Sequence, residues 1–182
     1  MGKIIRWAIV SFLVFFSVTA GFLYFRLGAF KPVELQLVES ATSMTILYKK
    51  HQGPYHEIIQ TINEVENWAK SNGVDCPETF GEYLDNPAAT DPDRLRSHGG
   101  CIINNLPPQS PDGFNIRTIE FKQYLQARFD GSPAIGPMKV YPKAQEWFRQ
   151  NPNLSFSGTT MEIYKILPGG EEMQTTYLFP IN

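Results

Sequence analysis

The stretch Met-Thr-Ile-Leu-Tyr-Lys-Lys-His-Gln-Gly-Pro-Tyr at residues 44–55 decides the fold, because the second half of the chain repeats its plan. The counterpart at residues 123–133 reads Gln-Tyr-Leu-Gln-Ala-Arg-Phe-Asp-Gly-Ser-Pro. Three matched pairs, Gly53–Gly131, Trp68–Trp147 and Tyr83–Tyr164, are separated by 78, 79 and 81 residues. An offset that changes only across loops is typical of a duplicated supersecondary unit.

Each half predicts the order strand, helix, strand, strand. We assign repeat one to residues 44–105, a proline-rich linker to 106–114 and repeat two to 115–182. The helix of repeat one is expected over 55–71, from apolar residues at three- and four-residue spacing. In repeat two, the prolines near its start leave only Lys143–Gln150 as predicted regular helix.

These elements predict an α+β fold. Two units pair into one antiparallel sheet with helices on one face, and we expect the crevice between the units on the other face. Clefts between packed units are favoured sites for small ligands.

An apolar segment precedes this domain. The 19 residues from Trp7 to Phe25 carry no charge, and as a helix they span about 28 Å, close to the ~30 Å hydrocarbon core. We predict a membrane anchor over residues 1–26 that crosses the bilayer through 7–25, followed by a tether over 27–43 with a short strand near Val33–Val38. Basic residues flank both ends, so the sequence does not assign a side of the membrane.

The alternative for this segment is a cleaved signal peptide. Val18-Thr19-Ala20 supplies the small residues that a signal peptidase requires. Apolar residues continue to Phe25, however, and a cleaved leader does not need them. The anchor is therefore the preferred interpretation.

Composition excludes some partners. Without Lys3 and Arg6, the rest of the chain holds 14 of the 16 basic residues and all 18 acidic ones, a net charge of −4. Because phosphate contacts dominate nucleic-acid binding, we expect no nucleic-acid partner.

The histidines lack metal-ligand spacing, so neither a metal nor a cofactor is expected. Cys76 and Cys101 are expected as buried thiols, with a disulfide in an oxidising compartment as the alternative.

Four phrases in order carry a resemblance to a known family: His51-Gln52-Gly53-Pro54-Tyr55, Tyr83-Leu84-Asp85-Asn86-Pro87, Met161-Glu162-Ile163-Tyr164 and Phe179-Pro180-Ile181. Together they resemble the GyrI-like family, the effector-binding fold of drug-sensing transcription regulators. With its apolar N-terminus, the chain is similar to a membrane-anchored subgroup that includes a testis-expressed receptor for autophagy of the endoplasmic reticulum. No part of this sequence matches that receptor's long tail, so its function is not expected here.

Glu162 is the main candidate for a functional residue. The resemblance implies that a glutamate at this position meets cationic ligands at the bottom of an aromatic pocket. Tyr83, Tyr164 and Tyr177 are the expected ring members, and Tyr141 a possible lid. By strand alternation, we expect Met161 and Ile163 to face the helices and Glu162 to face the other way. The alternative is an ordinary exposed strand glutamate.

Three functions follow from these residues. A half-buried carboxylate among tyrosines suits a lipophilic or cationic small molecule, through charge pairing and cation–π contact. The alternative is a hydrolase of small reactive molecules with Glu162 as base, although the sequence has no evident nucleophile paired with a base. The third is a protein-interaction scaffold that has lost ligand binding. We expect a binder rather than an enzyme.

Overall fold

A computed structural model describes residues 2–107, 112–167 and 173–182. Its elements are α1 (Gly2–Arg26), β1 (Val33–Val38), β2 (Thr42–Gln52), α2 (Ile58–Ser71), β3 (Glu78–Tyr83), β4 (Arg96–Ile102), β5 (Asn115–Phe121), β6 (Tyr124–Phe129), α3 (Gly136–Gln150), β7 (Thr160–Ile166) and β8 (Met173–Pro180), with short 3-10 turns at Tyr55–Glu57 and Pro92–Arg94. The sequence also predicts a hairpin at Gly169-Gly170, and these two residues lie outside the described ranges.

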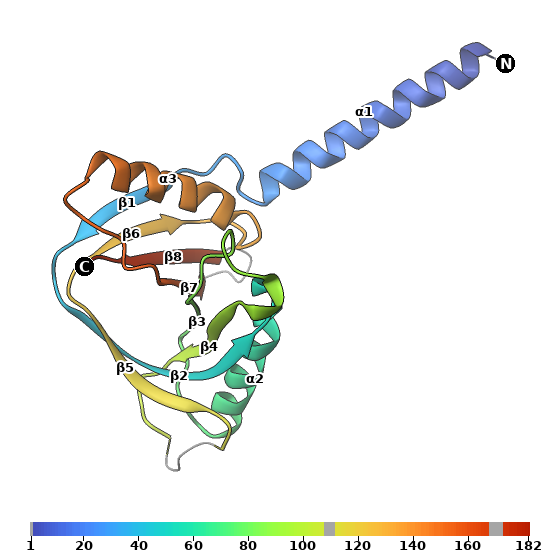
Figure 1. The fold of residues 1–182 in the computed structure, drawn as a ribbon. Helices are drawn as coiled ribbons and strands as arrows, with labels where there is room; N and C mark the ends of the chain where they lie inside the picture. The colour runs from blue at the N-terminus through green and yellow to red at the C-terminus, as the bar shows by residue number, and fades with distance from the viewer. Residues whose placement is uncertain (1, 108–111, 168–172) are drawn as a thin grey trace.

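The strands form one antiparallel sheet in the order β1-β6-β8-β7-β3-β4-β2-β5. The sheet curls strongly, and α2 and α3 lie on its outer face (Figure 1). Both halves have the predicted order, β2-α2-β3-β4 and β6-α3-β7-β8, and they meet where β3 pairs with β7. The α+β fold with helices on one face is confirmed, while a common origin of the halves stays a prediction.

Helix α2 packs on its half of the sheet through one apolar stripe. Ile58, Ile62, Val65 and Ala69 are buried, at the spacing that places them on one helix face. Gly99 of β4 permits close approach, because a Cβ there would lie 3.0 Å from the Ile62 side chain. The helix ends near Asn72-Gly73, where Gly73 takes φ +67.

Helix α3 is longer than predicted. It begins at Gly136, whereas the sequence predicted regular helix only from Lys143. Pro137 lies in the first turn, where a helix needs no backbone donor. Pro142 lies on the exposed side, so the helix loses one hydrogen bond where water solvates the carbonyl it frees. Burial of Val140 and Ala144 against the sheet compensates for that loss.

Helix α1 projects away from the domain (Figure 1). Its segment Ile5–Arg26 has a mean hydropathy of 2.1 and is long and apolar enough to cross a membrane, although a signal sequence meets the same criteria. After it, residues 27–43 include β1, which pairs with β6 at the edge of the sheet.

The two cysteines form a disulfide between β4 and the loop that follows α2. Cys76 and Cys101 are bonded, with Cα atoms 5.4 Å apart. The expectation of two free thiols was therefore wrong. The sequence alone does not distinguish free thiols from a disulfide, because disulfide formation depends on the distance between the two backbones after folding.

Candidate functional site

Glu162 lies near the middle of the sheet, on the face that the helices cover. It is opposite Gly81 of β3 and Tyr177 of β8. The predicted direction was wrong: Met161 and Ile163 pack into the cluster on the helix-free face. Strand alternation separates the two sets correctly, but the helices of this fold cover the glutamate side.

Tyrosine hydroxyls surround the Glu162 carboxylate. The Tyr141 hydroxyl of α3 donates to Oε1 at 2.9 Å, and the Tyr164 hydroxyl donates to Oε2 at 3.1 Å. The Tyr83 and Tyr164 hydroxyls lie 2.9 Å apart. Glu162 is only 4% exposed, whereas Tyr83, Tyr141 and Tyr164 are half-buried and form its cover.

Two glycines make room for these rings. A Cβ on Gly81 would lie 2.9 Å from the Tyr83 hydroxyl, and one on Gly136 would lie 2.2 Å from the Tyr177 hydroxyl. Tyr177 is fully buried, and its hydroxyl has no hydrogen bond of normal geometry among the described residues. The structure therefore brings together all five side chains predicted from the sequence, with Tyr177 as the rigid wall.

Burial dominates the electrostatics of this cluster. It raises the pKa of the Glu162 carboxyl to about 7, although hydrogen bonds from Tyr141 and Tyr164 oppose the shift. No basic side chain contributes to this pKa. Burial and the Glu162 charge also raise the phenol pKa values of the surrounding tyrosines, so these remain neutral donors. The result is a sheltered acid with no cationic partner in the part of the chain that the structure describes.

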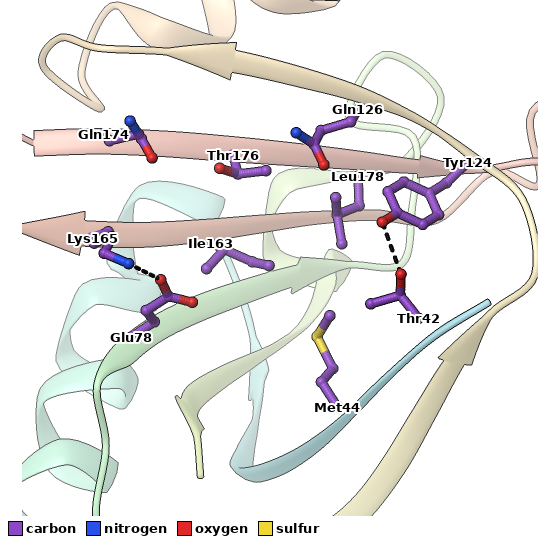
Figure 2. Close-up of a pocket in the computed structure, with 10 residues that line it drawn as sticks. All are labelled: Thr42, Met44, Glu78, Tyr124, Gln126, Ile163, Lys165, Gln174, Thr176 and Leu178. Carbon is purple, nitrogen blue, oxygen red and sulfur yellow. Dashed lines mark hydrogen bonds and ion pairs between the residues drawn. The ribbon is translucent and has the colours of Figure 1, made fainter. Parts of the chain in front are cut away.

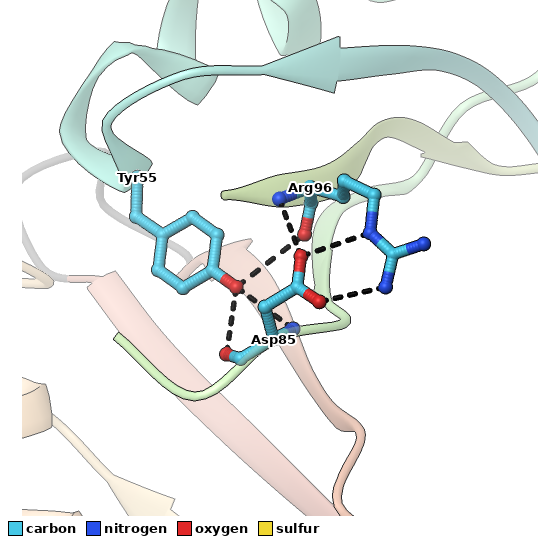
Figure 3. Close-up of polar contacts among 3 residues, drawn as sticks. All are labelled: Tyr55, Asp85 and Arg96. Atoms are coloured by element: carbon cyan, nitrogen blue, oxygen red, sulfur yellow. Dashed lines mark hydrogen bonds and ion pairs between the residues drawn. The ribbon is translucent and has the colours of Figure 1, made fainter. Parts of the chain in front are cut away.

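Tyr55 supports this cluster from the first unit, a role that the sequence did not indicate. Its ring lies 4.7 Å from that of Tyr83. Its hydroxyl donates to the Asp85 carbonyl at 2.8 Å and accepts from the Asp85 amide at 3.0 Å (Figure 3). Arg96 holds the Asp85 carboxylate through Nε at 3.0 Å and Nη2 at 2.7 Å. Two of the quoted phrases thus meet at Tyr55 and Asp85, a contact that their separation in sequence conceals.

A second buried carboxylate lies on the helix-free face and was also missed. Glu82 is 8% exposed; His98 Nδ1 lies 2.6 Å from its Oε2, and the Arg117 guanidinium donates to the same oxygen. Arg117 also lies 5.2 Å from the centre of the Tyr48 ring. Burial opposes ionisation of Glu82, but the hydrogen bond with His98 and the Arg117 charge outweigh it, so the pKa of this carboxyl is lowered.

The helix-free face also holds an open pocket of about 190 Å³ (Figure 2). Ile163 and Leu178 form apolar lining, Gln126 adds an amide, and Glu78 and Lys165 are paired at 2.9 Å on its rim. None of the five predicted site residues lines it. Its volume is below the ~300–1,000 Å³ typical of ligand sites, and its charges already have partners. The unpaired Glu162 is therefore the stronger candidate.

No group of three or more metal-ligating side chains is found in residues 2–107, 112–167 and 173–182. His51 has a turn role: its Nε2 lies 3.3 Å from the Pro54 carbonyl. Chemically, the Glu162 carboxylate can pair with a cation. Because the pKa of this group lies near neutrality, the carboxylate can also act as a general base that accepts a proton.

Comparison with known proteins gives a family match. The family model for the GyrI-like small molecule binding domain matches residues 37–182. No curated protein sequence matches the chain.

Solved structures give the same fold. The C-terminal domain of EcmrR is 14% identical with a TM-score of 0.62, over 83% of this chain and 97% of that domain. EcmrR in a complex with DNA has the same identity and TM-score, over 98% of this chain and 68% of that one. A hydrolase from Listeria innocua is 13% identical with a TM-score of 0.53, over 82% and 92% of the two chains. At these identities the likeness shows the fold alone.

Proposed function

Because this chain belongs to the GyrI-like family of small-molecule-binding domains, we propose that it binds a lipophilic or amphipathic cation at Glu162. We further propose that α1 anchors it in a membrane, as in the anchored subgroup, and that it has no nucleic-acid partner. One observation carries the proposal: a carboxylate that is 4% exposed and that, among the described residues, accepts side-chain hydrogen bonds only from phenols.

The physical argument is that the Glu162 carboxylate has no positively charged partner among the described residues. A buried carboxylate is costly unless it is paired, and its raised pKa records that cost. A cationic ligand supplies the absent partner, and the faces of Tyr83, Tyr141 and Tyr164 add cation–π contact. Because these three rings are half-buried, they can move aside to admit the ligand, while Tyr177 stays in place.

The test is titration of the full chain in detergent micelles with tetraphenylphosphonium, against tetraphenylborate as an anion of the same shape. We expect the phosphonium alone to bind, and Glu162→Gln to weaken it at least about tenfold, or 1.4 kcal/mol. Glu66→Gln removes the same charge from an exposed position of α2 and should leave binding unchanged. Equal binding of both ions, or wild-type affinity in Glu162→Gln, would contradict the proposal.

The pKa near 7 also favours a second function, hydrolysis with Glu162 as general base towards water. That function predicts ring opening of a small epoxide such as styrene oxide to its diol. The turnover should be lost in Glu162→Gln and kept in Glu66→Gln. If the wild-type chain shows no turnover while the phosphonium binds, the binder is retained. If the wild-type chain shows neither turnover nor phosphonium binding, the remaining candidate is a protein-interaction scaffold that has lost ligand binding.

A further inference from the structure

The segment that follows α1 packs against the start of α3, the helix that carries Tyr141. The Ser132 amide donates to the Leu27 carbonyl at 3.0 Å. Gly28, at φ +82, lies so close to the next loop that a Cβ there would be 3.1 Å from the Gly131 Cα. The turn after α1 is therefore docked on the loop between β6 and α3.

Lys139 of α3 holds this turn. Its ammonium donates to the carbonyl oxygens of Ala29 and Lys31 and lies 5.0 Å from the centre of the Phe129 ring. Lys139 lies in the first turns of α3, two residues before Tyr141. The helix that supplies a donor to Glu162 is thus fixed at its N-terminal end to the end of the apolar helix.

Connectivity then limits how far this end can lie from a membrane that α1 crosses. Ala29 is three residues beyond Arg26, so their Cα atoms are at most about 11 Å apart. The headgroup layer adds about 5–7 Å to each side of the hydrocarbon core. Because Lys139 contacts the Ala29 carbonyl, the start of α3 stays near the headgroup layer of a membrane that α1 crosses.

The side chains exposed at this end suit that layer. Phe30 is 75% exposed and turns back towards α1, with its ring 5.9 Å from Tyr24 and 6.4 Å from Phe25. Met138 is 68% exposed beside Lys139. Tyrosine and tryptophan collect at membrane interfaces, and phenylalanine and other apolar side chains of interfacial helices enter the boundary between headgroups and acyl chains.

We propose that Phe30 and Met138, at the N-terminal end of α3, form a second membrane contact in the phospholipid headgroup layer. Met138 and Tyr141 are three residues apart and neighbours on the helix surface, so the contact borders the cover of Glu162. This inference rests on the proposed anchor but not on ligand binding. The domain is held against the bilayer, with its ligand site next to the lipid.

The test measures the depth of single labels on the full chain in vesicles of phosphatidylcholine and phosphatidylglycerol. A fluorescent NBD label is placed by Met138→Cys or, as control, by Gln150→Cys, twelve residues and about 18 Å along α3. Both positions are exposed, and the native cysteines are already bonded. Lipids with a nitroxide high on the acyl chain report proximity.

We expect quenching at position 138 at least twice that at position 150. Equal quenching at both positions, or none at position 138, would overturn the contact. Because no ligand is present, this result is independent of the phosphonium titration. If the label at position 138 stays unquenched while Glu162-dependent phosphonium binding is intact, only the membrane contact is rejected. If the label is quenched but that phosphonium binding is absent, only the ligand proposal is rejected.

Discussion

Glu162 and Glu82 lie on neighbouring strands of one sheet, almost equally buried, yet their carboxyl groups have opposite pKa shifts. Glu162, on the helix-covered face, has only phenolic donors among the described residues, and burial raises its pKa to about 7. Glu82, on the helix-free face, is also penalised by burial but has His98 and Arg117 beside it, and its pKa is lowered. Burial alone thus decides neither the charge nor the role of a carboxylate. The difference is whether the fold supplies a counter-charge: it does so at Glu82, whereas at Glu162 the described residues supply none.

The largest expected effect comes from removing the paired carboxylate. Glu82→Gln leaves Arg117 without its partner; because the Arg117 side chain is 39% exposed, we expect the loss to be about 2–3 kcal/mol, below the cost of breaking a fully buried ion pair. Glu162→Gln, which replaces an unpaired acid by a neutral group of the same shape, should not destabilise the fold at pH 7, because it removes the cost of ionising the buried carboxylate that the raised pKa records. Chemical unfolding of both variants in the same detergent measures this difference. If Glu162→Gln were the more damaging, the two sites would have been misassigned.

The next effect is a pH dependence of opposite sign at the two sites. The folded-state pKa of Glu162 is raised from 4.5 to about 7, so between these values the folded state binds more protons than the unfolded state. Stability from this group therefore falls as pH rises, by about 2 kcal/mol between pH 5 and 7. The contribution of Glu82 is present above pH 4.5 and is lost as pH falls through its lowered folded pKa.

The control for this pH effect is Glu162→Gln. The slope of unfolding free energy against pH between 5 and 7 should become less negative than that of the wild type, while the acid-side loss due to Glu82 remains. A wild-type slope in the variant would show that another group titrates there.

The smallest effect tests the phenols around Glu162. Tyr141→Phe removes one hydrogen bond to the carboxylate while it keeps the ring, at a cost of about 1 kcal/mol when the carboxylate is ionised. The pKa of Glu162 should rise above its wild-type value, because the Tyr141 hydrogen bond opposes the shift. Carbon-13 NMR of labelled glutamate follows the titration directly. Tyr48→Phe, near Glu82, is the matched control and should leave the Glu162 titration unchanged.

Much of the fold could be predicted because its signals are local. The apolar stripe of the repeat-one helix and the short strand near Val33–Val38 each depend on a few neighbours in sequence, and both are confirmed to within a few residues. The start of α3 was wrong, because burial of Val140 against the sheet outweighs the cost of Pro142. Local propensity does not include that tertiary gain.

The residues of the candidate site also divide into those that could be predicted from the sequence and those that could not. Its five side chains could be named from a family resemblance and strand alternation. The support from Tyr55 could not, because its contact with Asp85 joins residues 30 apart in sequence. The Glu82 cluster was missed because His98 and Arg117 reach it from β4 and β5, and only the strand register places them side by side.

The sequence by itself determined the paired plan of strands and helices and the apolar N-terminal segment, because these are properties of composition and spacing along the chain, and a family resemblance added Glu162 and its tyrosines as the expected site. Only the tertiary structure decided which face the helices cover, which of two buried glutamates receives a counter-charge, that Cys76 and Cys101 meet, and that Lys139 holds the end of α1. The physical reason is that alternation separates two faces of a strand without saying what packs on either one. The partner of each buried group is chosen by pairing register and helix placement, which join residues far apart in the chain.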